Sequence, residues 1–310
     1  MRRSTGRTEP ILRRYWNQLE RLARQGAIDE LPSAILRLPD RLSGHKDAPE
    51  VDYRLVAGYM RGLELSDSLQ ATVAGLLEAH CLYRAGDTVP ARERFAQARA
   101  EAAALGAERG AERGQIGVCL EAMACCGEAL ARMRAGELRE AAGLAREAVR
   151  VARGADSAWL KAYARHTLGR VLGARPEERK RARALLEQAA NAYRSPGAKD
   201  LRGEAYVLHI LGRIEADAGE SDRALQTLHR GLSLMRRSRA DRGAATLLID
   251  LGWLRSYQQS YALARTCGRE ALEILNKCQD HRGLAKACHL IGWTSLCEGA
   301  YQEARAQFSS

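Results

Sequence analysis

Proline and aromatic residues are scarce in this sequence. Among 310 residues there are 7 prolines and 2 phenylalanines, and aromatic residues make up 5% of the chain. Proline interrupts helices, whereas the abundant alanine, leucine, arginine and glutamate are strong helix formers. Apolar residues reach 46%, which is ample for a packed core. The composition therefore predicts an all-α protein.

Long apolar runs and cysteine motifs are also missing. No run approaches the roughly 20 apolar residues of a membrane span, and Met1–Glu9 lacks the apolar stretch of a signal peptide. None of the eight cysteines forms C-x-x-C, and no His/Cys spacing is typical of a zinc site. We expect buried thiols in a reduced, cytoplasmic protein that uses no metal, cofactor or membrane.

Sequence motifs of the common enzymes are absent as well. There is no G-x-S-x-G, no H-E-x-x-H and no P-loop. The glycine-rich duplication Gly106–Gly114 lacks a preceding strand and a following Lys-Ser/Thr, so it predicts a flexible connection instead of a phosphate-binding loop. Cys288 and His289 are adjacent on one helix and point about 100° apart, which rules out a dyad between them. We expect no catalytic residue and no enzymatic activity.

The charge is strongly basic but scattered. The formal net charge is +11, and only 6 of the 49 basic residues are lysine. Such a balance attracts nucleic acid or acidic partners, but it also arises from a solvated surface of Glu/Arg pairs one helical turn apart. The sequence has no basic stripe with interleaved aromatics of the kind that single-strand binders use. The solvated surface is favoured, and a nucleic-acid-binding solenoid remains an alternative.

What the sequence does contain is a repeat of 40 residues. The step from Gly212 to Gly252 to Gly292 is 40 each time. The repeated segments are Tyr163-Ala-Arg-His166-Thr-Leu-Gly169-Arg170, Tyr206-Val-Leu-His209-Ile-Leu-Gly212-Arg213, Thr246-Leu-Leu-Ile249-Asp-Leu-Gly252-Trp253 and Lys286-Ala-Cys-His289-Leu-Ile-Gly292-Trp293. A fixed step of this size indicates stacked helical units.

Small residues recur at fixed distances within the repeat. Gly212 is followed by Ala224 and Leu228, as expected if the second helix of a pair packs closely against the first. With three extra residues allowed, Gly169 aligns with Ala184. Four glycines fall between paired helices, where a left-handed turn residue is needed; they are Gly86, Gly136, Gly219 and Gly299.

These residues resemble the tetratricopeptide repeat (TPR) from about Ala71 to Phe308. The usual repeat has about 34 residues. The longer form, with Asp241-Arg242-Gly243 at the start of a repeat, resembles the repeats of MalT-like bacterial regulators. The resemblance implies a right-handed α-α superhelix, a TPR-like solenoid, with an irregular helical N-terminal cap. The expected divisions are a disordered tip (residues 1–10), capping helices (residues 11–66), and an array of about six repeats with an incomplete last one (residues 67–310).

The array stops inside a second helix, at Phe308. We expect this to be the front part of a longer polypeptide; a natural end with a frayed final repeat is the alternative. If the chain is the front part of a longer polypeptide, its alternative function is the sensor or regulatory part of a signalling ATPase, a transcription regulator or a CHAT-type protease. An uncapped last repeat also predicts self-association.

In TPR-like arrays the first helix of each pair lines the concave groove. Residues six and three before the glycine, and one after it, fall close together on such a helix. These positions predict a binding groove made of Tyr163, His166, Arg170, Tyr206, His209, Arg213, Trp253, His289 and Trp293.

Two interpretations of these residues remain open. As a groove they form a basic patch beside an aromatic patch, suited to a protein or peptide, acidic and with an apolar anchor. Alternatively, duplicated repeats carry duplicated residues that pack between adjacent first helices. A metal site is disfavoured, since no carboxylate or cysteine recurs at these positions. The predicted function is a non-enzymatic binding scaffold.

Overall fold

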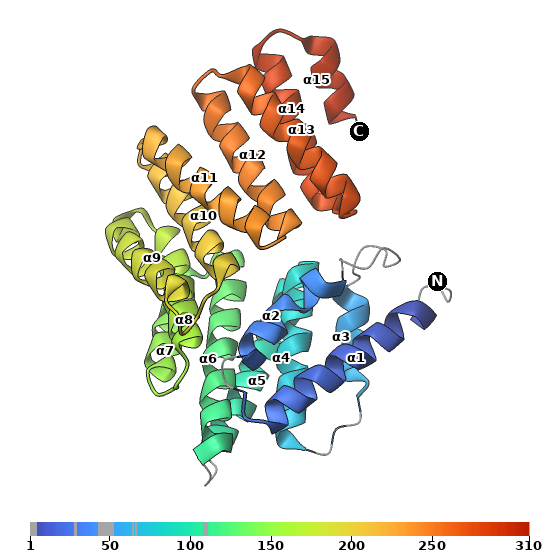
Figure 1. Ribbon diagram of the computed structural model, residues 1–310, viewed down its shortest axis with the longest axis vertical. Helices are drawn as coiled ribbons and strands as arrows, with labels where there is room; N and C mark the ends of the chain where they lie inside the picture. Colours follow the sequence, from blue (N-terminus) through green and yellow to red (C-terminus); the bar gives the residue numbers. More distant parts are fainter. Residues whose placement is uncertain are drawn as a thin grey trace. The chain divides into compact units, whose positions relative to one another are not determined.

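A computed structural model describes residues 5–27, 30–42, 53–63, 65, 67–107 and 111–309, and its regular elements in these ranges are helices (Figure 1). The all-α prediction is confirmed. The helices are α1 (Thr5–Arg24), α2 (Glu30–Leu42), α3 (Tyr53–Arg61), α4 (Ser68–Ala85), α5 (Thr88–Gly106), α6 (Ala111–Arg134), α7 (Leu138–Ala152), α8 (Ala158–Gly173), η1 (Pro176–Glu178), α9 (Arg179–Arg194), α10 (Leu201–Asp217), α11 (Ser221–Arg237), α12 (Asp241–Tyr257), α13 (Tyr261–Lys277), α14 (His281–Cys297) and α15 (Tyr301–Phe308).

The chain divides into two compact units, residues 1–198 and residues 199–310. Unit 1 holds α1–α3, followed by the pairs α4/α5, α6/α7 and α8/α9; unit 2 holds the pairs α10/α11, α12/α13 and α14/α15. Helix α1 begins at Thr5, inside the segment that we expected to be a disordered tip, and residues 1–4 lie outside the described residues. Likewise α6 begins at Ala111, within the expected flexible connection 106–114, whose residues 108–110 are outside the description.

Left-handed turns close the first helix of the pairs at the predicted glycines. Gly86, Gly136, Gly219 and Gly299 have φ values of 95°, 85°, 79° and 79°. At Gly219 the next amide, of Glu220, donates to the carbonyl of Glu215 at 2.9 Å, which is the six-to-one bond of a Schellman motif. The equivalent turn after α12 uses Gln259, with φ of 59°.

The glycines in the first helices allow close approach of the second helix. A Cβ atom at Gly212 would lie 2.6 Å from Cγ of Leu228. A Cβ atom at Gly169 would lie 2.6 Å from Cγ of Leu186 and 3.3 Å from the carbonyl oxygen of Ala182. The sequence alignment of Gly169 with Ala184 was therefore wrong: Ala184 is exposed, and Ala182 is the buried small residue. The 3-10 turn η1 absorbs the extra residues before α9.

The Arg-Gly dipeptide at the start of the first helices of unit 2, present as Arg202-Gly203, Arg242-Gly243 and Arg282-Gly283, has a structural role. The Arg242 guanidinium donates to the Cys278 carbonyl at 3.0 Å, so the start of α12 is tied to the end of α13. The equivalent Arg202 donates to the Ser238 carbonyl at 3.3 Å. These bonds satisfy carbonyls that a helix C-terminus leaves without intrahelical partners.

The residue two positions before this arginine is the N-cap of the helix, and an aspartate there stabilises the helix start. At α14 the Asp280 carboxylate accepts from the Gly283 amide at 2.9 Å, but at α12 the cap position is Ala240, which offers no acceptor. The backbone there (φ −95°, ψ 68°) is close to that at Asp280 (φ −93°, ψ 84°). We expect Ala240→Asp to raise the free energy of unfolding by about 1 kcal/mol. Urea unfolding followed by circular dichroism measures the change, and Asp280→Ala is expected to give the opposite sign.

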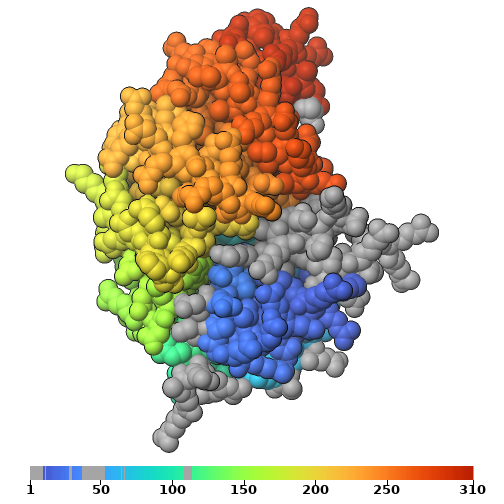
Figure 2. Space-filling model, viewed as in Figure 1, coloured from blue at the N-terminus to red at the C-terminus, as the bar shows by residue number. Residues whose placement is uncertain are grey.

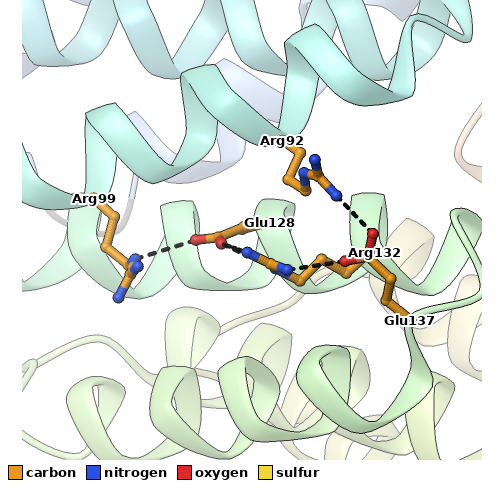
Figure 3. A network of polar contacts seen from close by, with 5 residues as sticks. All are labelled: Arg92, Arg99, Glu128, Arg132 and Glu137. Carbon is orange, nitrogen blue, oxygen red and sulfur yellow. Dashed lines mark hydrogen bonds and ion pairs between the residues drawn. The ribbon is translucent and has the colours of Figure 1, made fainter.

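A buried ionic network joins α5 to α6 in unit 1 (Figure 3). The Glu128 side chain is 1% exposed and lies 3.2 Å from the Arg99 guanidinium and 3.0 Å from that of Arg132. Arg132 also reaches Glu137 at 2.9 Å, and Glu137 in turn pairs with Arg92 at 2.6 Å. Alternating charges compensate the cost of burying the Glu128 carboxylate.

The first helices of neighbouring pairs lie against one another within each unit. In unit 1 α4 contacts α6 and α6 contacts α8; in unit 2 α10 contacts α12 and α12 contacts α14. Consecutive second helices approach one another less closely. This difference places the first helices on the concave side of each unit, here called the inner face.

Candidate functional site

The inner face of α4 and α6 is closed to outside partners. The three inner-face positions are Val73, Leu76 and His80 on α4 and Met123, Cys126 and Leu130 on α6, and all six side chains are buried. Helix α2 packs against both α4 and α6, and α1 packs against α4. The Gln70 amide on α4 donates to the Glu20 carboxylate on α1 at 2.5 Å. The chain's own N-terminal helices therefore pack against these inner-face helices.

His80 on α4 is buried and packs against the second helix α5. Its ring meets Phe95 edge-on at 4.9 Å, and burial lowers the pKa of the imidazole to about 3, with a smaller contribution from Arg84. The ring is thus neutral at physiological pH. This buried, neutral ring offers no charge for an ion pair with a binding partner.

On α8 the predicted site residues belong mainly to a packed aromatic core. The Tyr163 ring stacks on Trp159 with 5.2 Å between centroids, and the side chain is 8% exposed. Burial raises the pKa of its hydroxyl. His166 meets Tyr193 edge-on at 6.2 Å. Tyr163 was expected to line an open groove, and this is wrong because the ring is enclosed by its neighbours; Arg170 stays half-buried.

On α10 the three predicted site residues have different environments. Tyr206 and Arg213 are exposed, but His209 Nε2 lies 2.5 Å from an Asp250 carboxylate oxygen on α12. The sequence analysis missed Asp250. Asp250 could have been found from the sequence, because the equivalent residues of the neighbouring repeats, Ile210 and Leu290, are apolar. A carboxylate at such a position needs a polar partner.

The predicted aromatic residues of unit 2 do come together. The Trp253 ring lies 5.3 Å from His289 and 6.5 Å from Trp293. Two further rings that the sequence analysis missed extend the group: Tyr257 lies 6.4 Å from Trp253, and Phe308 lies 6.0 Å from His289. We call these five residues the ring cluster. Tyr257 could have been found, since it follows Trp253 by four residues on the same helix face.

The ring cluster is open to solvent. Tyr257 is 78% exposed, Phe308 51% and Trp293 42%. Of the eight large hydrophobic side chains that are exposed in the described residues, only Val89 lies in unit 1; the others are Tyr206, Tyr257, Leu263, Trp293, Leu296, Tyr301 and Phe308. The helices that carry the cluster appear orange to red in the space-filling view (Figure 2).

Four of the eight cysteines are buried. They are Cys81, Cys119, Cys125 and Cys126, and burial raises the pKa of the Cys81 and Cys125 thiols to about 12. In the described part of the chain, no group of three or more His, Cys, Asp or Glu side chains is placed to hold a metal ion. None of the described helices combines the length and apolar character needed to cross a bilayer.

Comparison with known proteins bears on the family. The tetratricopeptide-repeat family model matches residues 203–277, which cover α10 to α13 of unit 2. No curated protein sequence matches the chain.

Several solved structures share the fold at low sequence identity. A Rap protein complexed with competence and sporulation factor has a TM-score of 0.63 and 9% identity, with 97% of this chain and 96% of that chain covered. Aspartyl phosphate phosphatase F from Bacillus subtilis has a TM-score of 0.58 and 12% identity, over 100% of this chain and 74% of that one. A signal transduction ATPase with numerous domains and a TPR sensor, from Pyrococcus horikoshii, has a TM-score of 0.60 and 13% identity. The match covers 90% of this chain and 40% of that one.

These likenesses establish the fold and leave the activity open. Together with the 40-residue step and the left-handed turns, they show a TPR-like helical fold, and the matched segment 203–277 is similar to tetratricopeptide repeats.

Proposed function

We propose that this protein is a non-enzymatic scaffold that binds a protein or peptide segment through the inner face of unit 2. The observation that carries the proposal is the ring cluster, whose members are in ring contact with one another and yet largely exposed. In a chain with 5% aromatic residues, such a concentration on one open face is costly to solubility. Exposed apolar patches of this kind mark interaction sites.

The chemistry of the cluster suits an apolar anchor. Tryptophan and tyrosine give large contact areas with few rotatable bonds, and they dominate the binding energy of protein interfaces. Exposed Tyr206 and Arg213 on the neighbouring α10 supply polar contacts at the edge. The inner face of α4 and α6 plays no part in this proposal because α1 and α2 pack against those helices.

The predicted groove residues fall into three groups under this proposal. Tyr206, Arg213, Trp253, His289 and Trp293 contact the partner. His209 holds α10 to α12 through Asp250. Tyr163 and His166 pack the core of unit 1, with Arg170 at its edge.

Affinity capture from native lysate tests the proposal. The intact chain is compared with Trp293→Ser and with the control Tyr301→Ser, which removes a 69% exposed ring from a second helix. We expect at least one protein, identified by mass spectrometry, to be captured by the intact chain and the control and lost with Trp293→Ser. An identical catch from all three would contradict a role for the ring cluster, and nucleic acid in the eluate would favour the alternative.

A further inference from the structure

Helix α14 presents one exposed stripe with two chemically distinct halves. Arg282, Lys286, His289 and Trp293 are exposed, and their spacing of four, three and four residues places them on one helix face. The first half of the stripe is cationic, and the second half belongs to the ring cluster. The whole helix, from His281 to Cys297, contains no aspartate or glutamate.

The carboxylates that flank α14 in the sequence are already engaged. Asp280 caps the helix through the Gly283 amide at 2.9 Å, and Glu298 pairs with Arg265. Among the described residues, no carboxylate forms an ion pair with Arg282 or Lys286. Lys286 is therefore electrostatically available to a partner's carboxylate, whereas Arg282 stands at the position where Arg202 and Arg242 bond to second-helix carbonyls.

We propose that this stripe recognises an acidic peptide segment in which a carboxylate lies about 10 Å from a large apolar side chain. The inference rests on the proposed scaffold function and specifies its partner. Lys286 and Trp293 are seven residues apart, which is about 10 Å at 1.5 Å per residue. A partner matches this span with residues seven apart in a helix or three apart in an extended strand.

The two halves make different contributions. The apolar side chain packs on Trp253 and Trp293 and supplies most of the affinity. The carboxylate pairs with Lys286, which lies on the open surface, and so contributes selectivity and rate of association more than binding energy. Binding is accordingly expected to weaken as salt concentration rises.

Selection from a displayed library of random peptides, about 12 residues long, tests the proposal on the full chain. Peptides are selected on the intact chain after depletion on Trp293→Ser, and their affinities are measured by fluorescence anisotropy. The variant Lys286→Glu is compared with Lys277→Glu, which makes the same change of charge at an exposed position of the second helix α13. Circular dichroism verifies that each variant is folded.

We expect the selected peptides to share an acidic residue three or seven positions from a large apolar one. Their affinity should fall at least tenfold with Lys286→Glu and less than twofold with the control. Peptides with lysine in place of the acidic residue should regain binding to Lys286→Glu, which a merely structural role for this cation would not produce. Selected peptides that lack acidic residues, or that bind this variant unchanged, would overturn this inference and leave the scaffold function standing. Failure to enrich any peptide that discriminates the intact chain from Trp293→Ser would overturn both.

Discussion

Replacing Gly212 by leucine is expected to lower the free energy of unfolding of unit 2 by about 3 kcal/mol. A Cβ atom there would lie 2.6 Å from Cγ and 2.7 Å from Cδ2 of Leu228, whose side chain is 1% exposed and has no room to move. The second helix of the pair must then shift outward, away from the packed core of unit 2. Because the pairs of a repeat array stabilise one another, the damage extends to the neighbouring pair α12/α13.

Gly143→Leu is the matched control for this prediction. Gly143 lies inside α7, is exposed, and has nothing within 4 Å of the position of its Cβ. The same substitution there should leave stability unchanged or raise it by about 0.5–1 kcal/mol, because leucine favours the helix more than glycine does. Urea unfolding by circular dichroism gives both values. Equal effects of the two substitutions would contradict the close approach of α10 and α11.

Replacing Glu128 by glutamine is expected to lower the free energy of unfolding of unit 1 by about 2–3 kcal/mol. The carboxylate is 1% exposed and lies within ion-pair distance of Arg99 and Arg132. Removing its charge takes away the carboxylate that Arg99 and Arg132 share, although Arg132 keeps Glu137, and breaking a buried pair is strongly destabilising. The partial exposure of the arginines (39% and 27%) keeps the effect below that of a fully enclosed pair.

The exposed pair of Arg150 and Glu147 provides the comparison for Glu128. These side chains are 68% and 37% exposed, and the Arg150 guanidinium lowers the pKa of the Glu147 carboxyl through a hydrogen bond. Surface pairs contribute between about 0 and 1 kcal/mol, so Glu147→Gln should lower the free energy of unfolding by less than about 1 kcal/mol. Chemical unfolding at neutral pH and a fixed salt concentration ranks the two variants, and a larger loss at Glu147 would contradict the account of the network.

The sequence predicted most of the fold because its signals are local and repeated. A glycine every 40 residues, a small residue in the second helix and a glycine between paired helices reflect contact inside one helix pair, to which Gly252 adds a contact with Leu290 of the next pair. Where the repeat is irregular the prediction failed: nothing in the sequence shows that η1 shifts α9, so Ala184 was taken in place of Ala182.

The candidate site was less predictable, since it depends on contacts beyond one repeat. Equal positions in successive repeats do carry related residues, but their environments differ. Tyr206 on α10 is exposed. Tyr163, at the equivalent position on α8, is buried against Trp159. The packing of α1 and α2 against α4 and α6 follows from tertiary contacts that no repeat pattern encodes. The contacts of Trp253 with His289 and Trp293 were readable, because these residues stand at fixed distances from the repeat glycines.

Site-specific photocrosslinking tests the central claim most directly. The photoreactive amino acid p-benzoylphenylalanine replaces Tyr257, a 78% exposed member of the ring cluster, or Tyr301, a 69% exposed residue at the start of the second helix α15. Both chains are irradiated in native lysate, and their adducts are identified by mass spectrometry. We expect a discrete protein or peptide adduct from position 257 and none from position 301. Equal adducts at both positions, or an adduct at position 301 alone, would contradict binding through the inner face of unit 2.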